Sequence, residues 1–168
     1  MRHFASKSPA SLGLTEVLYE KADRIARVTI NRPQRYNAYS TRALEELASA
    51  LRDAAHDDAV GVIVITGAGD RAFCTGGDVK EYSEEYVRRP RDYWKYMNLF
   101  RDYIEAIIDS GKPTIARVNG MAVGGGNETQ LACDLSVMAE HAVLRQVGTH
   151  VGSVACGGAT QWLPLNIG

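Results

Sequence analysis

The stretch from Asn119 to Asp134, NGMAVGGGNETQLACD, constrains the fold of this chain more than any other. An apolar run of strand length, Thr114 to Val118, leads into it, and three consecutive glycines, Gly124 to Gly126, follow. Because glycine has no Cβ, backbone N–H groups in such a passage can approach a ligand closely. A helix that begins there would have unpaired N–H groups in its first turn and a dipole that favours negative charge.

Glu128 follows the glycines and falls just inside the predicted helix. The unpaired N–H groups suit a developing oxyanion, and a carboxylate beside it could act as acid or base. The alternative is a glycine-rich helix entry with a solvent-facing glutamate. This stretch alone leaves both interpretations open.

A second glycine loop, Thr75 to Asp78, also follows an apolar strand and can also precede a helix. We therefore expect both loops at the same end of a sheet, where ligands bind in α/β folds, and two converging N–H donors would form an oxyanion hole. Neither loop has the GxxxxGK[ST] or GxGxxG pattern of a phosphate site. The four histidines are scattered, so no metal cluster is indicated, and no serine lies in a GxSxG turn.

Strands alternate with helices along the chain, which predicts an α/β fold. The first elements that we expect are a hairpin (16–21 and 24–30), a helix capped by Ser40-Thr41 and ending near Asp57, and a doubly buried strand (60–66). A short helix or mobile flap (79–89) and a helix from Pro90 follow, and we interpret the apolar stripe of the latter as core. The remaining elements are a strand (114–118), β-prone runs (135–138 and 142–144), a loop (148–158) and a last helix from about Gly157. We expect a flexible arm over 1–13 and one core domain over 14–168. An amphipathic segment, 159–165, stops close to the C-terminus, so the chain looks incomplete there.

Composition excludes several classes of protein. Lys+Arg number 19 and Asp+Glu 20, so the net charge of −1 points to neither nucleic acid nor an anionic membrane. The sequence contains no run of 18 apolar residues, so no membrane span is predicted. Three cysteines without CxxC spacing indicate reduced thiols in a cytoplasmic protein, and we interpret Cys74 and Cys133 as packed small hydrophobes.

Several separated motifs, in order, resemble the crotonase (enoyl-CoA hydratase/isomerase) superfamily from about Glu16 onward. They are Asn31-Arg32-Pro33 with Asn37-Ala38, Ala72 to Lys80, Asn119 to Glu128, and Cys133-Asp134. The resemblance implies a spiral of repeated ββα units, incomplete here at the C-terminus. It also implies acyl-CoA thioester substrates and homotrimers or paired trimers. No metal or redox cofactor is implied, and CoA enters as part of the substrate.

Carried over by position, the resemblance makes Gly77 and Gly125 the N–H donors to the thioester oxygen. Glu128 falls on the first of two glutamates that the hydratases use. The positions implied to lie along the substrate and CoA are Arg35, Asn37, Ala38, Cys74, Gly76, Asp78, Lys80, Tyr82 and Gly124.

The chain departs from the hydratases where their second glutamate stands, because Gly148 occupies that position. In this loss the chain resembles both the dihydroxynaphthoyl-CoA synthases and the ring-cleaving alicyclic CoA hydrolases. The aspartate that those enzymes often carry after a Gly-Ser pair is absent from Gly152 to Ala155. A tyrosine-rich insert, Tyr82 to Tyr103, is either packing or a lid in which Tyr82 or Tyr86 donates a hydrogen bond. His150 could be a further acid or base, although a structural role is the simpler interpretation.

We therefore expect an enzyme that stabilises a thioester enolate, adds water to a cyclic oxo-enoyl-CoA and opens its ring. The alternatives are a simple enoyl-CoA hydratase or isomerase that uses Glu128 alone, and a non-catalytic fragment that binds CoA or forms oligomers.

Overall fold

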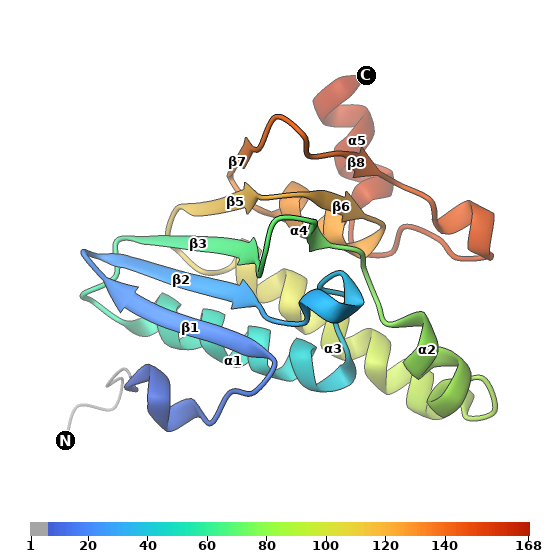
Figure 1. The fold of residues 1–168 in the computed structure, drawn as a ribbon, viewed down its shortest axis with the longest axis horizontal. Coiled ribbons are helices and arrows are strands. Elements are labelled where there is room, and N and C mark those ends of the chain that lie inside the picture. The colour runs from blue at the N-terminus through green and yellow to red at the C-terminus, as the bar shows by residue number, and fades with distance from the viewer. Residues whose placement is uncertain (1–6) are drawn as a thin grey trace.

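A computed structural model describes residues 7–168, in which helices alternate with strands as the sequence predicts (Figure 1). The strands are β1 (Val17–Ala22), β2 (Ile25–Ile30), β3 (Val62–Gly67), β4 (Ala72–Cys74), β5 (Thr114–Val118), β6 (Met121–Val123), β7 (Leu135–Met138) and β8 (Leu144–Arg145). The helices are α1 (Thr41–His56), α2 (Val79–Glu81), α3 (Pro90–Ile108), α4 (Gly125–Ala132) and α5 (Ala159–Ile167). Short turns are the 3₁₀ helices η1 (Pro9–Leu12), η2 (Pro33–Arg35) and η4 (Gly148–Val151), and the π-turn η3 (Tyr82–Tyr86).

The strands form two sheets. The larger sheet has the order β1-β2-β3-β5-β7 and is parallel apart from the β1–β2 hairpin, and the smaller, parallel sheet has the order β4-β6-β8. Helices α1 and α3 lie along one face of the larger sheet, while α4 lies beside the strands β5 and β6 (Figure 1). The two sheets follow one another along the chain direction, because β3 leads into β4 and β5 leads into β6.

Local patterns explain why the predicted hairpin and first helix form. In β1 and β2 buried residues alternate with exposed ones, and Asp23 and Arg24 make the turn with φ of 50° and 64°. The hydroxyl of Ser40 caps α1 by accepting a hydrogen bond from the Ala43 N–H at 3.1 Å. Both predictions are confirmed, and the helix presents its buried face, which includes Leu44, to the core.

The later elements differ from the predictions in detail. Ile63 and Ile65 of β3 are buried but Val62 and Val64 are only half-buried, so the second face of this strand is partly open. Within the segment 79–89, residues 79–86 are helical, which agrees with one of the two predicted alternatives, and α2 continues directly into η3. The predicted run 142–144 contributes only its last residue to β8, because that strand pairs with β6 at Leu144 and Arg145.

The stripe of α3 packs in the core, as predicted, with Tyr96, Phe100, Tyr103, Ile104 and Ile107 buried. Residues 1–6 of the predicted arm lie outside the described residues, and η1 forms within the rest of it. None of the helices in the described part of the chain has the length and apolar content that crossing a bilayer requires.

Candidate active site

The two glycine loops meet in the structure. Strand β4 ends at Cys74 and β6 at Val123, and the two strands pair in parallel, so both loops leave the same end of the smaller sheet. A Cβ built on Gly76 would lie 3.1 Å from the backbone nitrogen of Gly125. The expectation that the loops lie at a common sheet end is thus met.

The helix after the second loop begins within the glycine run and not after it. Gly124 is the N-cap with φ of 55° and ψ of −121°, and α4 starts at Gly125 inside the glycine run. The N–H of Gly124 donates to the Arg145 carbonyl at 2.9 Å, whereas within residues 7–168 the N–H groups of Gly125 and Gly77 donate no hydrogen bond. Two unpaired N–H donors therefore remain on neighbouring loops.

Tyrosine hydroxyls lie where a Cβ on either donor residue would project, so a larger residue there would have to displace a ring or the loop. A Cβ on Gly77 would lie 1.5 Å from the hydroxyl oxygen of Tyr82, and a Cβ on Gly125 would lie 1.7 Å from that of Tyr39. Such distances are far inside van der Waals contact, and neither glycine has a positive φ. The constraint is therefore close approach rather than backbone conformation.

Glu128 is buried, so the solvent-facing alternative is wrong. Its side chain lies on the first turn of α4 with an exposed fraction of 3%. One oxygen, Oε1, accepts hydrogen bonds from the N–H groups of Gly157 at 2.6 Å and Ala159 at 3.2 Å, at the start of α5. Among the described residues, Oε2 accepts none. Burial raises the pKa of Glu128, and the two N–H donors only partly offset it.

Sequence reasoning did not anticipate the contact between Glu128 and α5. Gly157-Gly158 before the amphipathic segment is the signal that marks a helix entry there. Nothing in the sequence, however, shows that this entry turns its N–H groups toward a carboxylate 29 residues earlier in the chain.

Hydrogen bonds of Asp78 anchor the first loop, and those of Asn37 anchor the turn between β3 and β4. The Asp78 carboxylate caps α2 by accepting from the Lys80 N–H at 3.1 Å, and Arg32 donates to it at 3.0 Å. Burial alone would raise the pKa of Asp78, but the Arg32 hydrogen bond and the N–H donors of α2 outweigh it and lower this pKa. The Asn37 amide donates to the carbonyls of Ala68 and Ala72 at 2.9 and 2.8 Å.

The remaining predicted positions divide by exposure. Arg35 is exposed on η2, and Lys80 is exposed and forms an ion pair with Glu84 at 3.6 Å. Ala38 is buried, and its carbonyl accepts a hydrogen bond from Arg32. The Cys74 thiol is fully buried, which raises its pKa to about 12, so this side chain packs as a neutral group.

The tyrosine-rich insert folds over the first loop. Tyr82 donates to the Tyr96 hydroxyl at 2.7 Å, with ring centroids 5.0 Å apart. Tyr86 and Tyr93 complete a group of four rings, and the Tyr86 hydroxyl is hydrogen-bonded to Thr41. Burial raises the pKa of Tyr82, so its hydroxyl remains protonated at neutral pH. This tyrosine cluster thus lines the space beside Gly77.

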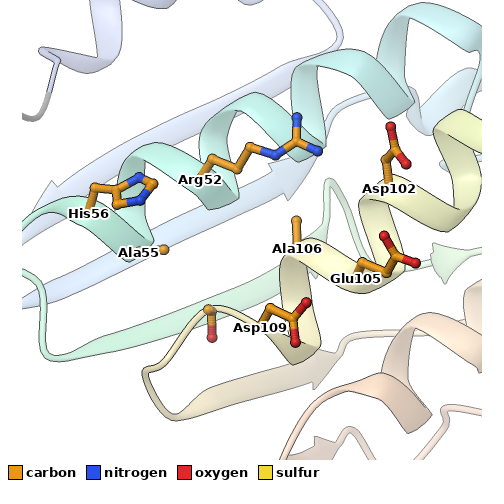
Figure 2. Close-up of a pocket in the computed structure, with 8 residues that line it drawn as sticks. Arg52, Ala55, His56, Asp102, Glu105, Ala106 and Asp109 are labelled. Carbon is orange, nitrogen blue, oxygen red and sulfur yellow. The ribbon is translucent and has the colours of Figure 1, made fainter. Parts of the chain in front are cut away.

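A polar groove of about 270 Å³ lies elsewhere, between α1 and α3 (Figure 2). Its lining residues are Arg52, Ala55, His56, Asp102, Glu105, Ala106, Asp109 and Ser110. Figure 2 shows the residues of α1 on one side of the groove and those of α3 on the other. No predicted site residue lines it. His150 is exposed on η4, two residues after Gly148.

Known proteins resemble this chain in sequence. The 6-oxocyclohex-1-ene-1-carbonyl-CoA hydrolase of Geobacter metallireducens is 46% identical over 141 residues, and that of Thauera aromatica is 45% identical. Each match covers 84% of this chain but 37% of the relative. The chain thus spans little more than a third of the length of these curated relatives.

Solved structures agree with the fold. An enoyl-CoA hydratase from Bacillus anthracis matches with a TM-score of 0.85 and 33% identity, covering 92% of this chain and 59% of that one. The predicted α/β crotonase-like fold is therefore confirmed. The enoyl-CoA hydratase/isomerase family profile matches residues 20–168. With the two glycine loops and the resemblance to these relatives, that match shows that the chain belongs to the enoyl-CoA hydratase/isomerase family.

Proposed function

We propose that this chain carries the enolate-stabilising site of an enzyme that adds water to a cyclic oxo-enoyl-CoA and opens its ring. One observation carries the proposal: two unpaired N–H groups, on Gly77 and Gly125, lie on adjoining loops, and the buried carboxylate of Glu128 follows within one turn of helix. The names of the hydrolases from Geobacter and Thauera support the choice of a cyclic acyl group.

The proposed chemistry uses the two N–H groups as fixed donors to the thioester oxygen. Attack at the β-carbon, or cleavage of the ring C–C bond, places negative charge on that oxygen as an enolate. Donors already in position stabilise this charge more than the neutral ester, which lowers the barrier. Removing one such donor typically costs about 10²–10³ in rate.

Glu128 is the proposed base that positions or deprotonates water. Its Oε1 accepts two backbone N–H groups, which fix the carboxylate, and Oε2 remains for a water molecule. Burial raises its pKa and so brings it closer to neutrality, as a general base requires. CoA binding falls, in this proposal, to the exposed cations Arg35 and Lys80 and the adjoining loops. The proposed assembly is a homotrimer or a pair of trimers.

A second candidate is a simple enoyl-CoA hydratase or isomerase. The similarity to the hydratase of Bacillus anthracis favours it, whereas Gly148 at the position of the second glutamate argues against the two-glutamate mechanism. A third candidate is a non-catalytic fragment that binds CoA esters, which the partial coverage of the relatives keeps open.

The test measures turnover of 6-oxocyclohex-1-ene-1-carbonyl-CoA and of crotonyl-CoA, each with the wild-type protein and with Glu128→Gln. Ring-opened product that disappears in the variant supports the proposal. Turnover of crotonyl-CoA alone supports the hydratase. Binding of both esters without turnover of either supports the non-catalytic candidate.

A further inference from the structure

Tyr39 connects the two glycine loops, although the function proposed above assigns it no role. Its N–H donates to the Gly76 carbonyl at 2.9 Å, and its carbonyl accepts from the Asp78 N–H at 3.1 Å. Tyr39 therefore forms a parallel bridge with Gly77, which lies between these two partners. The backbone of Tyr39 thus fixes how the first N–H donor is presented.

The side chain of the same residue reaches the second loop. A Cβ built on Gly125 would lie 1.7 Å from the Tyr39 hydroxyl oxygen and 2.9 Å from Cζ of its ring. Tyr39 therefore contacts both glycines of the proposed donor pair, one through its backbone and the other through its hydroxyl.

The surroundings hold the Tyr39 ring but leave its hydroxyl unpaired. The ring is 2% exposed, stacks on Phe100 with centroids 5.5 Å apart, and meets the edge of Tyr103 at 6.1 Å. Within residues 7–168 the hydroxyl makes no hydrogen bond. Among the described residues, the hydroxyl that is sealed from solvent without a partner is that of Tyr103 and not that of Tyr39. The Tyr39 hydroxyl therefore remains reachable from the site, and a ligand atom can supply its partner.

Burial raises the pKa of Tyr39 well above its ordinary value, so the hydroxyl keeps its proton and can act as a donor. The neighbouring tyrosine hydroxyl, on Tyr82, already donates to Tyr96. Tyr39 thus lies against Gly125 with a hydroxyl proton that no described residue accepts.

We propose that the Tyr39 hydroxyl is a third hydrogen-bond donor to the acyl thioester oxygen, beside the N–H of Gly125. This inference rests on the proposed function and deepens it. A phenol O–H held against the ring stack needs no reorganisation when charge develops on the oxygen, so it adds to the stabilisation that the two N–H groups give.

The test records the infrared carbonyl band of cyclohexanecarbonyl-CoA, labelled with ¹³C at the thioester carbon and bound to the full protein. This ester has no double bond to hydrate, so the band reports hydrogen bonding without turnover. We expect a band shifted to lower frequency in the wild type, a smaller shift in Tyr39→Phe, and the wild-type shift in Tyr103→Phe. Tyr103→Phe is the matched control, because it removes a hydroxyl from the same ring cluster.

Two further measurements test the role of the Tyr39 hydroxyl independently: the turnover of Tyr39→Phe, and the carbonyl band of a variant whose hydroxyl is a stronger hydrogen-bond donor. Tyr39→Phe should lower kcat about 10²-fold with little change in KM, as expected for an interaction made mainly in the transition state. Replacement of Tyr39 by 3-fluorotyrosine keeps the hydroxyl and makes it a stronger donor, so the band should move further. This variant tests the inference even if the phenylalanine variant does not fold.

The outcomes separate the two proposals. A shifted band that is the same in wild type, Tyr39→Phe and the fluorotyrosine variant overturns the role of Tyr39 and leaves the N–H pair intact. A wild-type band at the frequency of the free ester, with the ligand bound, overturns both. A band that responds to Tyr39 in a protein that does not open rings supports the donor role and rejects the ring-opening reaction.

Discussion

At the scale of single residues, the site depends on the absence of a Cβ atom at Gly77 and Gly125. The two glycine loops were predicted from their place after apolar strands, and the choice of Gly77 and Gly125 as N–H donors came from the family resemblance. The tyrosine hydroxyls that occupy their Cβ positions were not predicted, because Tyr39 and Tyr82 meet them through long-range contacts. Local patterns fix which backbone groups are unpaired, whereas the packing of distant side chains decides how much room surrounds them.

We expect Gly125→Ala to abolish turnover. The added methyl group would overlap the Tyr39 hydroxyl, so either the loop or the ring must move and the N–H donor leaves its position. The loss should reach at least the roughly 10²–10³-fold of a missing oxyanion donor, measured as kcat/KM. Gly61→Ala is the control, because a Cβ there meets its nearest neighbour at an ordinary 3.4 Å. Turnover retained in Gly125→Ala would contradict the donor role of this loop.

The raised pKa of Glu128 predicts opposite effects on activity and stability. A base must be deprotonated, so kcat/KM should rise with pH through the raised pKa. The folded protein holds the Glu128 proton more tightly than the unfolded chain does. The stability that this proton contributes to the folded state is therefore complete below the ordinary pKa of a glutamate, and it is lost as pH rises through the raised pKa of Glu128 in the folded protein. Glu128→Gln should therefore lower turnover about 10²–10⁴-fold.

The same variant should have a higher Tm than the wild type at pH 8, because the amide keeps the acceptor oxygen without the buried charge. Thermal denaturation of both proteins at pH 8 and pH 5 measures this, and the gap should narrow at the lower pH. A variant less stable than the wild type at pH 8 would show that the carboxylate charge stabilises the fold, contrary to its raised pKa.

At the scale of elements, strong local signals were sufficient for the first half of the fold. The alternation in β1 and β2 and the cap of α1 at Ser40 predict those elements within one or two residues. The β8 strand was misplaced because it exists only through its pairing with β6, and two residues carry little pattern of their own. The division of 79–89 into α2 and the π-turn η3 likewise follows from tyrosine packing rather than from sequence periodicity.

The cap of α1 gives a prediction for stability. Ser40→Ala removes the acceptor for the Ala43 N–H and a hydrogen bond to Glu16, and should lower the free energy of unfolding by about 1 kcal/mol. Urea denaturation measures the difference. Ser49→Ala, in the middle of the same helix, is the matched control and should change stability little. Equal effects from the two variants would mean that the cap contributes nothing.

At the scale of the whole molecule, two features of the site could not be derived from the chain's own patterns. The burial of Glu128 depends on α5, which packs against α4, and the tyrosine cluster depends on the packing of η3 against α3 beside Gly77. The sequence predicted Glu128 and the two glycine loops, whereas the contacts that bury Glu128 and surround Gly77 are visible only in the structure. The smaller sheet gathers the two loops because β4 and β6 are parallel neighbours.

The edge of the larger sheet predicts self-association of the 168-residue chain. Strand β7 pairs with β5 alone among the described strands, and its apolar side chains are open, with exposed fractions of 61% for Leu135 and 62% for Val137. An apolar edge strand presents unpaired backbone groups and favours pairing with another chain. Sedimentation velocity should therefore show the mean sedimentation coefficient rising with protein concentration.

A charged side chain in the middle of β7 should oppose the self-association of the chain. Val137→Lys places an ammonium group on β7 and should remove the rise of the mean sedimentation coefficient over the same concentrations, since lysine on an edge strand opposes pairing. Val154→Lys adds the same charge at a more exposed valine, 75% open, outside any strand, and should leave the association unchanged. If both variants associate like the wild type, the contact lies elsewhere on the molecule; if neither does, net charge rather than the β7 edge controls it.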